Sequence, residues 1–305
     1  MTGRSAVLVL LLALMPALTA CGTDDPVAEP PLPSSPPASA VDSPGVPTSP
    51  SVASTATPGM TPTRTTTAEP GTVPPPWLGT RPLPLRPDGY GQAGSTPPEL
   101  DPRRFTLPDT VAALPGTGFA AVVEAVPADV LARSTWEPSC PVGADDLAYV
   151  RLAFWGFDDR RHTGELLLDA AVADEVVGVF RTLYEHHFPF EELRITTRAE
   201  LDAPATGDGN DTGAFVCRPT TGSTSTFSQH AYGLAIDLDP FQNPYVKGDL
   251  LLPELASAYL ARDHVRPGMI TPDGVVVRAF AAIGWTWGGS WSSLKDYQHF
   301  SRNGR

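Results

Sequence analysis

The sequence predicts a single α+β domain that follows a long segment with no core of its own. Up to about Leu100, Pro, Ser, Thr, Ala and Gly dominate, and large apolar side chains are too few to offset the entropy of ordering the chain. From Asp101 onward, strand-like and helix-like stretches follow one another without a regular βαβ alternation. We therefore expect one compact domain over residues 101–305, with a small, mainly antiparallel sheet flanked by helices.

The first half of this domain has the pattern of a hairpin. Residues 119–126 (FAAVVEAV) are apolar and suit a buried strand or a short helix, and residues 148–155 (AYVRLAFW) alternate like a half-buried strand. The stretch 156–159 (GFDD) is typical of a turn, and residues 164–168 form the expected returning strand.

The second half alternates short strands with helices. Residues 169–187 carry apolar side chains at a helical period, and residues 275–283 do the same up to Gly284. Residues 202–213 are polar and rich in Gly, as expected of a loop. Two further strands and one further helix are predicted: strands at 193–197 and 234–238, and a helix at 250–259.

The N-terminus has the features of an export signal. Arg4 precedes an apolar stretch from Ala6 to Leu18, which is too short to span a hydrocarbon core of about 30 Å. The sequence Leu18-Thr19-Ala20-Cys21 resembles the lipobox read by lipoprotein signal peptidase, which implies that residues 1–20 are removed and that Cys21 is acylated. A plain signal peptide cleaved near Ala20, with Cys21 incidental, is the alternative.

These features predict an extracytoplasmic protein of the bacterial, actinobacterial-type lipoprotein class, anchored in the cell membrane by lipid. Residues 21–100 would be a disordered Pro/Ser/Thr-rich tether that gives the domain reach from the membrane. The formal net charge of −13 and the absence of a Lys/Arg-rich run argue against a nucleic-acid partner. We expect the domain to be monomeric.

The chain has three cysteines, and their number suggests a disulfide. If lipid occupies Cys21, then Cys140 and Cys217 remain as a pair in a compartment that permits oxidation. We expect these two to form a disulfide, and two buried free thiols are the alternative.

Two histidine motifs near the C-terminus carry the candidate chemistry. His230 and Asp237 lie in one motif, and Asp296 and His299 lie in the other. Two imidazoles and one carboxylate are a common ligand set for catalytic zinc, which keeps a further position open for water. Gly233 can turn the chain so that His230 and Asp237 converge. Asp296 is placed to act as the base that takes a proton from the attacking water.

The pattern S-x-H-x-x-G-x-A-x-D, followed far downstream by D-x-x-H-F, resembles the zinc D-alanyl-D-alanine carboxypeptidase family, which includes L-alanyl-D-glutamate endopeptidases. The resemblance covers about Cys140 to Phe300 and none of the tether. It implies the fold of that family, which is also called hedgehog-like, and an activity on peptidoglycan stem peptides. It also implies Zn2+ held by His230, Asp237 and His299, with Asp296 as the catalytic base.

The resemblance further implies two residues on the substrate side of the site. Arg218 would hold a peptide carboxylate or polarise the scissile carbonyl, and Ser228 would contact the substrate. D-alanyl-D-alanine carboxypeptidase activity is the favoured function. The alternatives are an L-alanyl-D-glutamate or D,D-endopeptidase, or a zinc-containing module that binds wall peptides without cutting them.

Other titratable residues are expected to have structural roles. His162 and Glu165 fit the same branch of the family, but as structural or cleft-lining residues. The loop at 208–213 has the composition of a calcium site but has Pro219 where the closing glutamate would stand. We therefore expect a turn-rich loop there.

Overall fold

A computed structural model describes residues 69–304 of the chain. The predictions made for residues 1–68, including the signal peptide, Cys21 and the first part of the tether, lie outside the described residues. Within the described part the protein combines several small sheets with four α-helices. The predicted α+β class is therefore confirmed.

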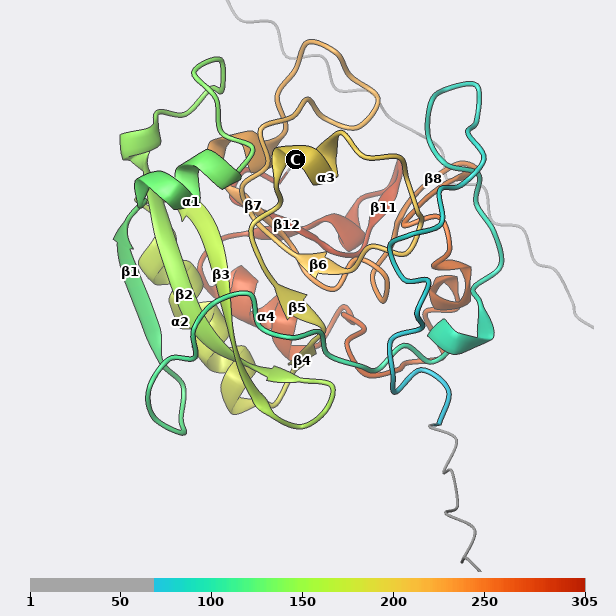
Figure 1. Cartoon of the computed structure of the whole chain (residues 1–305), viewed down its shortest axis with the longest axis horizontal. Coiled ribbons are helices and arrows are strands. Elements are labelled where there is room, and N and C mark those ends of the chain that lie inside the picture. The colour runs from blue at the N-terminus through green and yellow to red at the C-terminus, as the bar shows by residue number, and fades with distance from the viewer. Residues whose placement is uncertain (1–68, 305) are drawn as a thin grey trace, which may run out of the picture. The chain divides into compact units, whose positions relative to one another are not determined.

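The largest sheet is built on the predicted hairpin. It comprises β1 (Ala121–Ala125), β2 (Leu147–Gly156) and β3 (Arg161–Asp169), which are antiparallel, and the short β4 (Pro189–Phe190), which pairs in parallel with β2. The turn between β2 and β3 includes Asp159, whose φ is +57°. This sheet lies on one side of the domain (Figure 1).

Because each has one apolar face, α2 (Ala173–Glu185) packs on this sheet and α4 (Val275–Ala282) packs on α2. In α2 the side chains of Val176, Phe180 and Leu183 recur at a helical period and are buried. In α4 Phe280 is buried, and it belongs to the same hydrophobic cluster as the inner face of the sheet. Both helices lie within the residue ranges that the sequence predicted.

Three smaller sheets hold the second half of the domain. The first has the strand order β10–β12–β7, the second β11–β8–β9, and the third pairs β5 with β6 in parallel. Their bounds are β5 Glu192–Leu193, β6 Asp211–Thr212, β7 Ala235–Asp237, β8 Tyr245–Lys247, β9 Leu250–Leu252, β10 Thr286–Trp287, β11 Lys295–Asp296 and β12 His299–Ser301.

The remaining helices are short. They are the α-helices α1 (Ala128–Arg133) and α3 (Arg198–Leu201) and the 3₁₀ turns η1 (Pro98–Leu100), η2 (Ala144–Asp146), η3 (Gln229–Tyr232), η4 (Ser257–Leu260) and η5 (Gly288–Ser290). No helix among residues 69–304 is both long enough and apolar enough to cross a membrane.

Two predicted elements differ from the structure. The helix predicted at 250–259 is wrong, because Leu250–Leu252 is strand β9, which returns against β8 after a turn at Gly248. Pro253 follows this strand and cannot donate a ladder hydrogen bond, so the strand ends there. Further on, only the 3₁₀ turn η4 forms. The strand predicted at 193–197 is shorter than expected and pairs only through Glu192–Leu193.

The boundary between tether and domain also needs correction. The sequence predicted a disordered tether up to residue 100, but residues 69–100, here called the N-terminal arm, pack on the domain. Leu100 is fully buried, and Trp77 and Leu78 pack against a cluster that includes Phe241 and Tyr259. Composition did not reveal these few apolar side chains, because prolines surround them in the sequence and their packing partners lie far along the chain.

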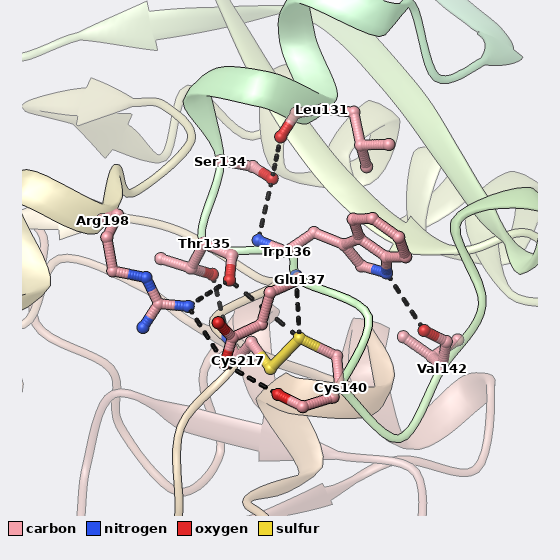
Figure 2. Close-up of a disulfide and its surroundings, with 10 residues drawn as sticks. Leu131, Ser134, Thr135, Trp136, Glu137, Cys140, Val142, Arg198 and Cys217 are labelled. Carbon is pink, nitrogen blue, oxygen red and sulfur yellow. Dashed lines mark hydrogen bonds and ion pairs between the residues drawn. A yellow bond between two sulfur atoms is a disulfide. The ribbon is translucent and has the colours of Figure 1, made fainter.

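The expected disulfide is present. Cys140 and Cys217 are bonded, with their Cα atoms 5.9 Å apart, and the bond closes a separation of 77 residues. The backbone N–H of Cys217 also donates to Thr135 Oγ1 at 2.9 Å, and the indole of Trp136 donates to the Val142 carbonyl (Figure 2). The loop before β2 is thereby fixed to the segment that leads into the histidine motif.

Candidate active site

His230 is held by a short turn whose sequence explains its shape. Ser228 precedes η3, and its Oγ accepts a hydrogen bond from the His230 backbone N–H. Gly233 ends the turn with φ +69°, where a Cβ would lie 2.4 Å from the backbone nitrogen of Asp169. Only glycine avoids both the strained conformation and this clash. The imidazole Nδ1 donates to the carbonyl of Ala214 at 2.6 Å, so in the neutral ring Nε2 is the nitrogen that can bind a metal ion.

Asp237 and His299 face each other across two paired strands. β7 and β12 are antiparallel, and their register sets His299 opposite Asp237 and Phe300 opposite Ile236. Because side chains alternate along a strand, the first pair shares one face of the sheet and the second pair shares the other. Ile236 and Phe300 are fully buried in the core. The apolar side of the strands thus directs the two ligand side chains toward His230.

The three side chains meet in a geometry that suits zinc. His230 Nε2 lies 3.2 Å from Asp237 Oδ2 and 3.2 Å from His299 Nδ1, and His299 Nδ1 lies 3.0 Å from Asp237 Oδ1. Ligand atoms about 2.0–2.1 Å from a tetrahedral zinc ion lie about 3.3 Å from one another. Both imidazoles are buried, and the group can hold a metal ion. The structure therefore brings together the three predicted ligands.

The charge of Asp237 fits this donor set. Burial alone would favour the neutral carboxyl, but the His230 and His299 imidazoles outweigh it and hold the pKa of Asp237 below its usual range. The ionised carboxylate is the form of Asp237 that binds a divalent cation.

Asp296 lies on β11, three residues before His299, and β11 pairs with β8 so that Asp296 stands opposite Tyr245. Burial and the nearby charge of Asp237 raise the pKa of Asp296 to about 7, although His299 and Arg218 act in the opposite direction. Gly288 permits the close approach of this strand, because a Cβ there would lie 2.7 Å from the Asp296 carbonyl oxygen. A carboxyl that titrates near neutrality can both accept and return a proton.

Arg218 and Ser228 border the same site. The Arg218 guanidinium makes one hydrogen bond to a described residue, to the Pro219 carbonyl at 3.2 Å, so most of its donors remain for a ligand. Ser228 lines a cavity beside the histidines, and its hydroxyl caps η3. The structural role of Ser228 is therefore evident, and its predicted contact with substrate stays a prediction.

Two cavities meet at His230 and Asp237. The larger, about 730 Å³, is here called the acidic hollow because it has six acidic and three arginine side chains on its walls: Glu192, Glu200, Asp208, Asp211, Asp237, Glu254, Arg103, Arg194 and Arg218. The second, about 590 Å³, is here called the base-side hollow because Asp296 lines it, together with Lys247, Tyr245 and Trp291. Arg218, His230, Asp237, Leu252 and Gln298 line both.

Several of these wall residues were not identified from the sequence. Gln298 lies inside the D-x-x-H motif, and its hydrogen bond to Asp296 lowers the pKa of that carboxyl. Lys247 and the groups around Arg194 belong to no motif, so nothing in the sequence marked them. Arg194 pairs with Glu192 and Glu200, which are near in sequence, and with Asp211, which the fold brings close.

The residues that were expected to be structural make hydrogen bonds within the fold. Of these residues, Asp208 also lines the acidic hollow. Glu165 is buried, accepts a hydrogen bond from the Tyr149 hydroxyl at 2.6 Å and pairs with Arg133. His162 lies between Asp109 and Asp158. Asp208, in the loop at 208–213, accepts from the Gly79 N–H and the Thr206 hydroxyl.

The fold and this group of two histidines and one aspartate fit the class of a peptidase. Residues 221–302 match the family model described as D-alanyl-D-alanine carboxypeptidase, and the matched segment includes His230, Asp237, Asp296 and His299. This segment of the chain is similar to that peptidase family, as the motifs indicated. No curated protein and no solved structure matches the chain.

Removing one imidazole tests the metal centre. We expect His230→Ala to lower zinc affinity by more than about 100-fold, because loss of a ligand exceeds the 10- to 100-fold effect of outer-shell changes. Zinc per chain is measured by mass spectrometry of the metal after dialysis against a weak chelator. The exposed His264 is the control, and His264→Ala should keep one zinc ion. Equal zinc in both variants would contradict the assignment.

Glu192 in the acidic hollow gives a prediction about pH. Burial is the largest cause that raises its pKa from 4.5 to about 7, with help from Asp211 and Glu191 and against the attraction of Arg194. The folded state therefore binds this proton more tightly than the unfolded state does. Its contribution to stability is present below pH 4.5 and is lost as the pH rises toward 7.

Between pH 4.5 and 7, we expect the free energy of unfolding to change less for Glu192→Gln than for the wild type. The difference between the two changes should be up to about 3 kcal/mol. Urea unfolding of the metal-free protein at several pH values measures this difference. Glu185→Gln, at an exposed position, should follow the wild type. Parallel curves for Glu192→Gln and the wild type would show that Glu192 does not titrate in this way.

Proposed function

We propose that this peptidase is zinc-dependent and hydrolyses peptide bonds of peptidoglycan stem peptides, with D-alanyl-D-alanine carboxypeptidase activity. The observation that carries the proposal is the meeting of His230, Asp237 and His299 at the boundary of two hollows, one of which contains Asp296. The family match of residues 221–302 supports the same class of substrate.

Each side chain of the site has a role in peptide hydrolysis. A zinc ion held by His230, Asp237 and His299 would polarise the scissile carbonyl and lower the pKa of a water molecule. The Asp296 carboxylate takes a proton from the attacking water and then delivers it to the leaving amine. Arg218 donates to the oxygen on which negative charge develops.

The position of Asp296 indicates which way the substrate lies. Asp296 lines the base-side hollow and does not line the acidic hollow. Because the same group must protonate the leaving amine, the leaving residue occupies the base-side hollow. The acyl part of the substrate, N-terminal to the scissile bond, then lies in the acidic hollow.

The charges of the two hollows favour cleavage near the C-terminus of the substrate. Lys247 and Arg218 line the base-side hollow, where they can attract the terminal carboxylate of a leaving D-alanine. The acidic walls of the other hollow suit the amino group of the diamino acid that precedes the D-alanines in a stem peptide. An endopeptidase would instead place further peptide residues in the base-side hollow.

The other proposals concern the setting of this reaction. Through Cys21, the protein would be lipid-anchored to the cell membrane on its extracytoplasmic side, so that the domain meets the wall. A wall-binding module without activity is disfavoured because it would have no need of Asp296 in a buried position beside the metal ligands.

Turnover of a defined stem pentapeptide by the zinc-loaded protein tests this function. We expect the release of one D-alanine, detected by mass spectrometry of the products. Asp296→Asn should retain zinc and lower kcat by at least about 100-fold, because proton transfer by a positioned group contributes about 10²–10⁴-fold.

Product masses distinguish the rival functions. Cleavage between L-alanine and D-glutamate, or within a cross-link, would identify an endopeptidase. Full activity in Asp296→Asn would remove that residue as the base, and binding without any cleavage would favour the non-catalytic module.

A further inference from the structure

The N-terminal arm, residues 69–100, reaches the candidate active site. Leu78, Gly79, Thr80 and Pro82 line the acidic hollow beside residues of the 203–211 loop. The family match begins at residue 221, so this wall lies outside the segment shared with the family. Figure 1 shows the arm, in blue to cyan, along the side of the domain that carries β8.

Hydrogen bonds fix the arm to other segments that line the acidic hollow. The Gly79 N–H donates to Asp208 Oδ2 at 2.9 Å, and the Leu83 N–H donates to the Ala205 carbonyl at 2.8 Å. The Gly91 N–H donates to Glu254 Oε1 at 3.0 Å. Asp208, Ala205 and Glu254 all line the acidic hollow, so the arm is joined to it at three separate points.

Packing adds to these bonds. Trp77 and Leu78 pack against the cluster that contains Phe241 and Tyr259, and the Arg81 guanidinium lies 3.4 Å from the centre of the Trp77 ring. The side chain of Thr80 remains exposed. The arm therefore presents residues 78–82 to the hollow from an anchored backbone.

The arm also supports the loop beside the other hollow. The Tyr90 hydroxyl accepts a hydrogen bond from the Gly222 N–H at 3.1 Å. The loop around Gly222 contributes Thr220, Thr221 and Thr226 to the base-side hollow. One segment thus contacts the walls on both sides of the histidines.

We propose that residues 78–82 of the arm are a specificity-determining wall of the substrate site, which contacts peptide residues on the acyl side of the scissile bond. The inference rests on the proposed function for the direction of the substrate. It predicts that the arm matters for long stem peptides and has no effect on a substrate whose acyl part ends after one residue.

A bulky side chain at position 80 tests this wall. We expect Thr80→Trp to lower kcat/KM for a stem pentapeptide by about tenfold or more, because binding energy from remote residues of the substrate would be lost. The value for N-acetyl-D-alanyl-D-alanine should stay unchanged. Val73→Trp is the matched control, since Val73 is 55% exposed in the same arm and lines neither hollow.

Zinc content and the melting temperature show whether each variant is intact. Equal kinetics of Thr80→Trp and the wild type on the pentapeptide, or an equal loss in Val73→Trp, would overturn the inference. If the wild type cleaves neither substrate, the proposed function fails by itself. Calorimetric titration with the pentapeptide then decides the role of the arm: weaker binding to Thr80→Trp alone supports it, and equal affinity, or no binding by the wild type, refutes it.

Discussion

The antiparallel pairing of β7 with β12 places Asp237 and His299 side by side, and the rest of the site is arranged around this pair. The pairing is itself maintained by the core, because Phe300, directly after His299, stacks on Phe280 of α4 with ring centres 4.2 Å apart. A shift of β12 by one residue in register would turn Phe300 away from the core and His299 toward it. The burial of a few aromatic rings therefore determines where two candidate metal ligands lie.

The third ligand depends on a different set of constraints. His230 is positioned by the left-handed turn at Gly233 and by the Ala214 carbonyl, which accepts from its imidazole. Ala214 belongs to the segment that leads to Cys217, and the disulfide ties this segment to the loop before β2 (Figure 2). Arg218 follows directly, so the same covalent bond helps to place a substrate-side donor. The expected export of the chain and its cysteine pair are thus linked to the geometry of the site.

The sequence was most informative where a pattern is local. Helical periodicity located α2 and α4, strand alternation located the β2–β3 hairpin, and two short motifs predicted the group of His230, Asp237 and His299 that the structure brings together. It failed where the deciding contacts are distant in the chain, since the Gly79 N–H donates to Asp208, 129 residues away. From composition, residues 69–100 were predicted to be a tether, because few apolar side chains such as Trp77 stand among many prolines. No motif marks the acidic hollow, because its wall residues come from segments that are far apart in the chain.

The central claim is that His230, Asp237 and His299 together hold a catalytic zinc ion with an open position. X-ray absorption at the zinc edge of the purified, zinc-loaded protein tests it most directly, because the spectrum reports the type and number of ligands. The account predicts two imidazole nitrogens and one or two oxygens at about 2.0–2.1 Å, with one imidazole lost in His299→Ala. Sulfur ligands, six oxygens, or an unchanged spectrum in His299→Ala would contradict it.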